Sequence, residues 1–321
     1  MIRPQSRGPR KIDDFAGIEF GIGLQGDRGL SEYGPLGRLA EELGFDVVTA
    51  FGDAGYLPPM AVLMQVAAAT GRVRLGPSCL NPYTSHPVEI ASQIAALESA
   101  SGGRAYLGLA RGAWLEELGV AQPRPLRAIR EAAAVVARLL SGDDGGYRGQ
   151  MFAVAPGFRL KHPLPKRKIP LLIGAWGPRT VALAGEIADE LKVGGSANPD
   201  LVPVMRQRLG RASKTSIVMG AVTVVDEDGR AARERARAAV EMYFEVVAPL
   251  DPTLDGHQHG VAITEGLLDR FAFAGTPRSV ARQVRDLLDA GVARIEFGAP
   301  FGLAAESGLR LLGREVLPEF R

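Results

Sequence analysis

Short apolar runs alternate with longer helical patterns along almost the whole chain, and this alternation limits the possible folds more than any other feature. The apolar runs have strand length, and each is followed by a segment in which apolar residues recur at helical spacing. The predicted strands cover residues 18–23, 46–51, 72–76 and 104–109, a run that begins at residue 171, and residues 190–193, 216–225 and 294–297. Eight strands, each followed by a helix, are typical of a (β/α)8 TIM barrel. This is the α/β fold that we predict.

The main competing fold is an open, doubly wound sheet. That fold needs a Gly-x-Gly-x-x-Gly turn between its first strand and first helix. Gly21, Gly23 and Gly26 approach this spacing, but they lie within the first predicted strand, and no helix begins on them. We therefore favour the barrel, in which functional residues gather where the strands end. We expect Glu19 and Asp53 to be among those residues.

Two long segments interrupt the alternation. Residues 141–168 follow the fourth strand and its helix, and residues 251–264 follow the seventh strand and its helix. Segments of this length in a compact enzyme are either lids or surface elaborations, and the sequence is compatible with both. We assign them as insertions in a single domain of residues 17–321, which follows a flexible N-terminal tail of residues 1–16.

The composition indicates a soluble enzyme. Of the 321 residues, 46% are apolar and 23% are charged, which is enough for a large core. The net charge of +2 gives no reason to expect nucleic acid as a partner, and no apolar run is long enough to span a membrane. A single cysteine, Cys79, excludes an internal disulfide and fits the reducing cytoplasm. The four histidines lack the spacing of metal ligands, so we predict no metal.

A possible phosphate site follows the strand that begins at residue 171. Free N–H groups and the dipole at the start of a helix favour an anion, and an arginine there adds a charged donor. An ordinary strand-to-helix turn explains the same residues equally well. The segment consists of Gly174, Ala175, Trp176 and Gly177, followed by Pro178 and Arg179 at the predicted helix start.

Ordered sequence blocks from about residue 17 to the C-terminus carry a family resemblance. They are GIEFG at 17–21, LGPSCLNPY at 75–83, GGRAYLGL at 102–109, IGAWGP at 173–178, AGEIAD at 184–189, SANP at 196–199, FAGTP at 273–277 and GAPFG at 298–302. In their order and spacing these blocks resemble the bacterial-luciferase-like superfamily, and within it the branch of coenzyme F420-dependent methylenetetrahydromethanopterin reductases.

The resemblance implies a barrel that binds coenzyme F420, or FMN in sister branches, and transfers a hydride at the ring. The segment that packs against the ring in relatives matches Ser78, Cys79 and Asn81, and the Ser78–Cys79 bond is expected to be a non-prolyl cis peptide. Superfamily members usually pair, so we expect a homodimer. Arg111, Gly112 and Asn198, which follow strands, complete the predicted cofactor site together with residues 174–179.

Two carboxylates are the candidates for catalysis. The resemblance places a glutamate of the relatives in the pocket, which suggests Glu19 as an acid. An ion pair within the barrel, for instance with Arg111 or Arg72, would explain Glu19 equally well. Asp53 stands with Gly52 where relatives carry an Asp-His pair. It is the second carboxylate candidate, although Asp at such a place commonly caps a turn.

Three functional classes are compatible with these residues. The first is an F420-dependent oxidoreductase that transfers a hydride between the deazaflavin and a small organic substrate such as a C1-carrying pterin. The second is an FMN-dependent luciferase-like monooxygenase. The third is a non-catalytic flavin- or deazaflavin-binding protein, in which Gly52 and Asp53 mark a lost catalytic centre.

Overall fold

The computed structural model describes residues 17–254 and 262–321. The predicted tail at residues 1–16 lies outside the described residues. So does the middle of the second predicted insertion, including His257 and His259. Among the described residues, no helix combines the length and apolar character needed to cross a membrane.

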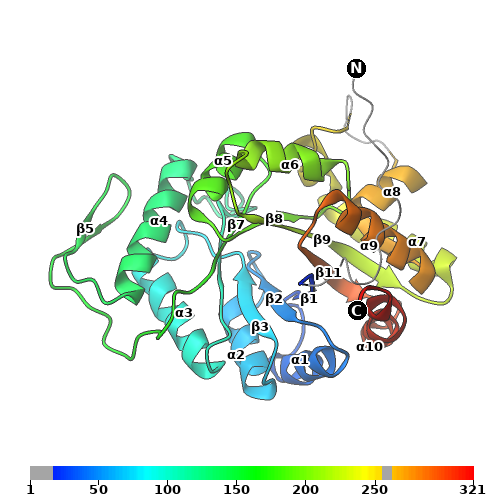
Figure 1. Cartoon of the computed structure of the whole chain (residues 1–321), viewed down its shortest axis with the longest axis horizontal. Helices are drawn as coiled ribbons and strands as arrows, with labels where there is room; N and C mark the ends of the chain where they lie inside the picture. The colour runs from blue at the N-terminus through cyan, green and yellow to red at the C-terminus, as the bar shows by residue number, and fades with distance from the viewer. Residues whose placement is uncertain (1–16, 255–261) are drawn as a thin grey trace.

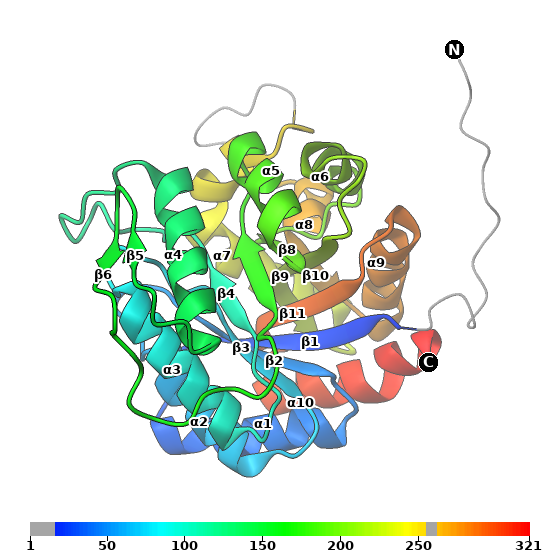
Figure 2. The same cartoon turned by 60° about the vertical axis from the view of Figure 1, so that its left-hand side comes forward.

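Within the described residues, eight parallel strands form the predicted TIM barrel (Figures 1 and 2). They follow the order β3-β2-β1-β11-β9-β8-β7-β4. The ring closes between β3 and β4, where Leu75 donates to Arg104 O at 3.0 Å and accepts from Tyr106 N at 2.9 Å. The barrel strands are β1 (Glu19–Leu24), β2 (Val47–Phe51), β3 (Arg74–Ser78), β4 (Leu107–Leu109), β7 (Leu171–Gly174), β8 (Glu190–Gly194), β9 (Ser216–Val225) and β11 (Arg294–Phe301).

Helices surround the strands in both views (Figures 1 and 2). Several of them begin with proline, whose fixed φ suits the first helical turn and whose missing N–H is not needed there. Outward-facing strand residues such as Ile22, Leu75 and Ile295 are fully buried beneath the helices and form the main core. The helices that follow barrel strands include α1 (Tyr33–Glu42), α2 (Pro59–Ala69), α3 (Pro87–Ala100), α4 (Pro125–Leu140), α5 (Pro178–Ile187), α6 (Leu201–Leu209) and α7 (Gly229–Val247).

The inside of the barrel is partly charged. Glu19, Arg74, Glu190 and Arg294 are the first residues of their strands, and they form ion pairs across the amino-terminal end of the barrel. Tyr106 fills the space above them, with the guanidinium carbons of Arg74 and Arg294 at 5.5 Å and 5.1 Å from its ring centroid. This arrangement closes the amino-terminal end and leaves the carboxyl-terminal end for a ligand.

The sequence-based prediction lacks the strand β10 (Ala272–Gly275) and the helix α9 (Pro277–Ala290), as well as the short hairpin described below. β8 pairs with the first half of β9, as far as Gly220, and β10 pairs with residues 222–225 of the second half. The single helix predicted over residues 304–317 is also only partly right. The structure has α10 (Ala305–Leu311), then a π-helical turn (Leu312–Val316) and a 3-10 turn (Leu317–Phe320).

The first predicted insertion forms a small hairpin on the outside of α4 (Figure 1). Its strands are β5 (Tyr147–Arg148) and β6 (Ala153–Val154). The buried Glu131 of α4 holds the hairpin by accepting hydrogen bonds from three backbone N–H groups of the turn, those of Gln150 at 3.0 Å, Met151 at 2.8 Å and Phe152 at 3.2 Å. This carboxylate is therefore one of the contacts that attach the insertion to the helical layer, together with the packing of Phe152 and Val154 on the main core.

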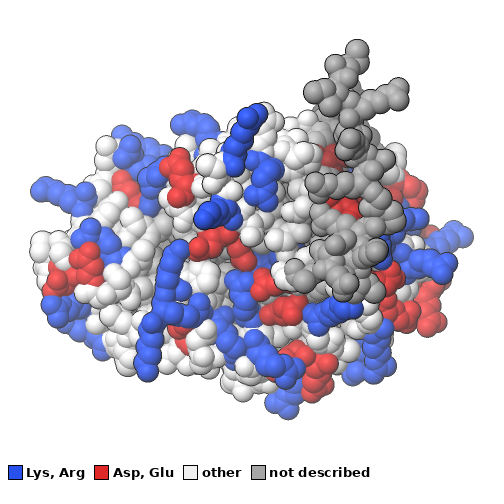
Figure 3. All heavy atoms as spheres, viewed as in Figure 1, with Lys and Arg blue, Asp and Glu red and all other residues white. Residues whose placement is uncertain are grey.

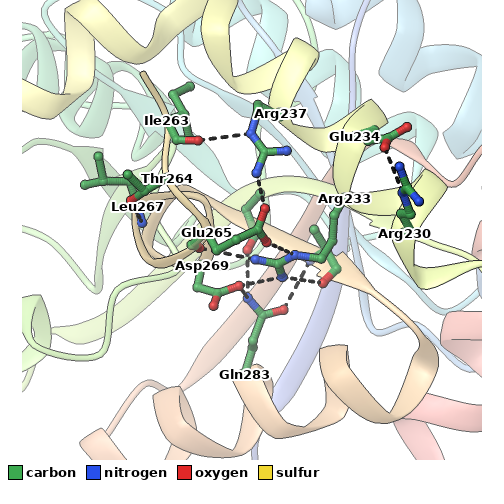
Figure 4. Close-up of polar contacts among 12 residues, drawn as sticks. Arg230, Arg233, Glu234, Arg237, Ile263, Thr264, Glu265, Leu267, Asp269 and Gln283 are labelled. Atoms are coloured by element: carbon green, nitrogen blue, oxygen red, sulfur yellow. Dashed lines mark hydrogen bonds and ion pairs between the residues drawn. The ribbon is translucent and has the colours of Figure 1, made fainter. Parts of the chain in front are cut away.

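A second, smaller core lies under α7, where α8 (Glu265–Phe271) and β10 pack against the far half of β9. Val240, Phe244 and Phe271 are buried in it. Figure 4 shows how α7 is also held to α8 by charged groups. Arg233 donates to Glu265 at 2.5 Å and to Asp269 at 2.7 Å, and Arg237 pairs with Glu265 as well.

Candidate active site

The carboxyl-terminal ends of the barrel strands form a partly exposed surface, which we call the mouth. Its inward-facing residues are half-buried, whereas those one layer lower are buried, so water reaches only the upper layer. Ligands of TIM barrels bind at this end. The mouth residues are Phe51, Ser78, Gly174, Gly194 and Val222, and the layer below contains Thr49, Gly76, Leu172, Lys192 and Gly220.

Glycines in the barrel strands make room for the side chains that line the mouth. A Cβ on Gly174 would lie 2.9 Å from Cys79 Sγ and 3.3 Å from the Ala110 Cβ. A Cβ on Gly23 would lie 3.2 Å from Glu296 Oε1 and would overlap the ring of Phe51. Because no side chain projects from these positions, Cys79 and Phe51 can lie close to the backbone of neighbouring strands at the mouth.

The segment after β3 contains the predicted non-prolyl cis peptide, between Ser78 and Cys79, so this expectation is confirmed. Burial raises the pKa of the Cys79 thiol to about 11, and the thiol is therefore neutral near pH 7. The side-chain oxygen of Asn81 accepts from the backbone N–H groups of Tyr83 at 3.1 Å and Thr84 at 2.9 Å. Asn81 thus shapes the turn, and Gly112 packs against it at a positive φ of 90°.

The loop after β7 is anchored by its tryptophan. Trp176 Nε1 donates to Gly194 O at 3.0 Å, and Arg208 donates to Trp176 O at 2.8 Å. Gly177 and Pro178 are exposed at the start of α5, where no side chain caps the free N–H groups. Arg179 is exposed and makes no hydrogen bond or ion pair with any other described residue. The predicted anion site at the start of α5 is therefore accessible. Ala175, which precedes Trp176 in the same loop, is half-buried.

Asp53 lies half-buried after β2 and accepts a hydrogen bond from Gln25 Nε2 at 3.2 Å. Burial raises the pKa of this carboxyl, and the Gln25 hydrogen bond and the positive charge of Lys192 offset part of that rise. A carboxyl group with a raised pKa keeps its proton to higher pH, which suits a general acid.

A buried ion pair between Lys192 and Glu296, which sequence reasoning missed, lies one layer below the mouth. Thr49 Oγ1 donates to Glu296 Oε2 at 2.8 Å, and Lys192 Nζ lies 5.2 Å from the centroid of the Phe51 ring. The sequence contains a pattern that indicates this charged interior. Charged residues occupy alternate positions of two otherwise apolar strands, at 190 and 192 and at 294 and 296, so each pair shares one face of its strand.

The fold and these residues can now be compared with known proteins. A family model described as luciferase-like monooxygenase matches residues 15–294. The chain belongs to this family. The resemblance inferred from the sequence blocks is confirmed.

Two relatives and one solved structure illustrate the similarity. The 5,10-methylenetetrahydromethanopterin reductase of Methanopyrus kandleri is 30% identical, with the alignment covering 96% of this chain and 100% of the reductase. An F420-dependent glucose-6-phosphate dehydrogenase of Microbacterium testaceum is 27% identical, with coverage of 95% and 98%. The structure of the coenzyme F420-dependent tetrahydromethanopterin reductase from Methanopyrus kandleri superposes with a TM-score of 0.84 at 28% identity, covering 95% of this chain and 99% of that chain.

In this luciferase-like barrel, the predicted position of Glu19 at the ligand end is wrong. Glu19 is the first residue of β1 and lies at the amino-terminal end, opposite the mouth. Its two carboxylate oxygens accept from Arg74 Nη1 at 2.8 Å and 2.5 Å. The alternative of an ion pair within the barrel is therefore correct, although the partner is neither Arg111 nor Arg72.

Two further residues of the predicted cofactor site are bonded elsewhere. The amide nitrogen of Asn198 donates to Asp251 at 2.9 Å and to Thr253 at 2.8 Å, and its oxygen accepts from Asp200 N. Both amide hydrogens are therefore used within the protein, and the residue is buried away from the mouth surface. Arg111 is exposed and donates to Gln122 at 2.8 Å within its own loop.

The face of the molecule seen in Figure 3 carries basic and acidic side chains in alternation, without a patch of one sign that spans it. The surface charge on this face therefore points to no polyanionic macromolecule. The chemistry must be sought at the mouth.

Proposed function

We propose that the protein is a coenzyme F420-dependent oxidoreductase that transfers a hydride between the deazaflavin and a small organic substrate. The observation that carries the proposal is a glycine-lined mouth in a chain whose full-length relatives are named as F420-dependent enzymes or as methylenetetrahydromethanopterin reductases. The family also contains proteins named as monooxygenases. An FMN-dependent monooxygenase is therefore the alternative that the test must exclude.

The residues of the mouth fit a flat tricyclic ring. Cys79 packs closely on Gly174 and the Phe51 ring packs closely on Gly23, so that both side chains present apolar or neutral surfaces at the mouth. The open start of α5 and Arg179, which has no partner in the described part of the chain, fit the phosphate of the cofactor. We expect Ser78, Cys79 and residues 174–179 to contact the cofactor, with Asn81 and Gly112 shaping the loops around it.

When bound, coenzyme F420 supplies or accepts the hydride, and the protein contributes position and protons. Phe51 and Cys79, which are half-buried at the mouth, cover the buried layer beneath and keep water from it. Asp53, held by Gln25, is the carboxyl group best placed to deliver a proton as a substrate is reduced. We assign Asp53 as the acid and Glu19 as a structural residue.

We further propose a C1-carrying pterin or a similar electron-poor compound as the substrate, because the reductase of Methanopyrus kandleri is the relative described above with the highest identity. We propose a cytoplasmic homodimer, supported by the single cysteine and by apolar side chains such as Met64 that remain exposed on α2. Light scattering at low protein concentration tests the homodimer, and a monomer there would reject it.

The cofactor is tested with the protein itself. Since Cys79 is the only cysteine, its alkylation by iodoacetamide reports ligand binding at the mouth. We expect F420 to bind tightly by fluorescence titration and to slow alkylation at least tenfold, whereas FMN has little effect. Tight FMN binding with oxygen consumption would support the monooxygenase instead. Binding without turnover of any hydride acceptor or donor would favour the non-catalytic alternative.

A further inference from the structure

The Lys192–Glu296 pair lies directly below the mouth, and stability alone does not explain it. Its side chains are 5% and 1% exposed. Removing two charges from water is costly, and replacing a buried ion pair by apolar residues of similar size is often neutral or stabilising. A pair retained at this place therefore calls for a functional reason.

Hydrogen bonds fix the carboxylate of Glu296 in a single orientation. Thr49 Oγ1 donates to Glu296 Oε2 at 2.8 Å, and Lys192 pairs with Oε1. Because the one hydroxyl hydrogen of Thr49 is used in this way, the contact of 2.5 Å between Thr49 Oγ1 and Tyr106 has the tyrosine as its donor. Burial raises the pKa of Tyr106, so the phenol stays protonated and keeps this role.

Glycines in adjacent strands give the pair its space. A Cβ on Gly220 would lie 3.2 Å from Glu296 Cβ and 3.5 Å from Lys192 Cε. One on Gly23 would lie 3.2 Å from Glu296 Oε1. The ammonium is held 5.2 Å from the ring of Phe51, which borders the mouth. The pair is thus a fixed dipole immediately beneath the ligand space.

We propose that Lys192 and Glu296 are positioning residues that set the electrostatic potential of the mouth, and that they thereby control how readily Cys79 and Asp53 hold their protons. The proposal rests on the proposed function only in treating the mouth as the active site. The two residues touch no reacting atom in this scheme. They act through the cysteine and the aspartate above them.

The surrounding charges support this scheme. Lys192 lowers and Glu296 raises the pKa of the Cys79 thiol, and Lys192 also lowers the pKa of Asp53. In the layer of the pair, β7 and β9 contribute the uncharged Leu172 and Gly220, and Gly23 of β1 lies against Glu296. Among the described residues, the titratable and charged groups that face this region are Cys79 after β3, Asp53 after β2, Tyr106 before β4, Lys192 on β8, and Glu296 with Arg294 below it on β11.

The test uses the rate of Cys79 alkylation by iodoacetamide, an uncharged probe, between pH 7 and pH 10. We expect Glu296→Gln to leave the ammonium uncompensated and to lower the apparent pKa of the thiol, and Lys192→Met to raise it. One pKa unit changes the thiolate fraction tenfold, and a more acidic thiolate is a weaker nucleophile. We therefore expect rate changes of about threefold or more in opposite directions at pH 8.

Two further variants keep the result interpretable. The double variant Lys192→Met/Glu296→Gln should return the rate to near the wild-type value and should fold even if a single variant does not. Lys168→Met removes an exposed lysine, paired with Asp189 at the surface, and should change nothing. Equal rates in wild type and both single variants, or shifts of the same sign, would overturn the proposal. F420 titration of the same proteins tests the proposed function separately, because alkylation needs no cofactor.

Discussion

Replacement of Glu19 by Gln tests whether this carboxylate is structural or catalytic. The change removes two charge-assisted contacts to Arg74, at 2.8 Å and 2.5 Å, with the two side chains 28% and 29% exposed. A hydrogen bond to a charged group contributes roughly 1.5–3 kcal/mol. Arg74 retains Glu190 at 3.3 Å, and partial exposure weakens the pair. We therefore expect a loss of about 1–2 kcal/mol in the free energy of unfolding.

That loss should lower the melting temperature by roughly 2–6 °C in a domain of this size. Turnover and F420 affinity should stay within about twofold of wild type, because the side chain lies at the opposite end of the barrel from the mouth. The matched variant Asp53→Asn should behave in the opposite way, with turnover reduced by about 10²-fold or more and little change in melting temperature. A tenfold loss of turnover in Glu19→Gln, with unchanged melting and cofactor affinity, would refute this assignment.

Three further predictions concern the mouth and the hairpin. Gly174→Ala places a Cβ 2.9 Å from Cys79 Sγ and should weaken F420 binding at least tenfold by fluorescence titration, whereas Gly71→Ala, where a Cβ meets nothing within 4 Å, should not. Because burial raises the pKa of Asp53, its carboxyl group loses the proton at a higher pH than usual. We therefore expect kcat/KM for substrate reduction to fall as the pH rises through that pKa. The variant Asp53→Asn should remove this pH dependence. The folded state binds this proton more tightly than the unfolded chain, whose pKa is close to the ordinary value of 3.8. Protonation of Asp53 therefore stabilises the folded state as the pH falls from the raised pKa towards 3.8. Glu131→Ala leaves three backbone N–H groups without their acceptor and should cost about 2–3 kcal/mol, with faster hydrogen exchange over residues 147–154.

The barrel was predictable from the sequence because apolar strands and helices alternate with few interruptions. The end of the barrel at which a residue lies was harder to predict. Glu19 and Asp53 both flank strands, but Glu19 begins β1 and Asp53 follows β2, and a short apolar run does not fix its own boundaries. The strand β10 was missed because four small and aromatic residues, buried on all sides, show no periodicity.

The interior pair was missed for a different reason. Lys192 and Glu296 come from strands far apart in the sequence, and only the closed ring of strands brings them together. Their alternate spacing with Glu190 and Arg294 indicates an inward face, but the partner of each charge depends on the register between strands. The predicted α5 anion site, in contrast, depended on a local pattern, and the structure leaves it accessible.

The small core under α7 affects how the protein unfolds locally. Phe244, Phe271 and the far half of β9 form a cluster separate from the main core, and the charged contacts of Arg233 stay within α7, α8 and β10. Such a unit can unfold locally while the eight-stranded ring keeps its own free energy of unfolding. Its amides would then exchange as a distinct cooperative group.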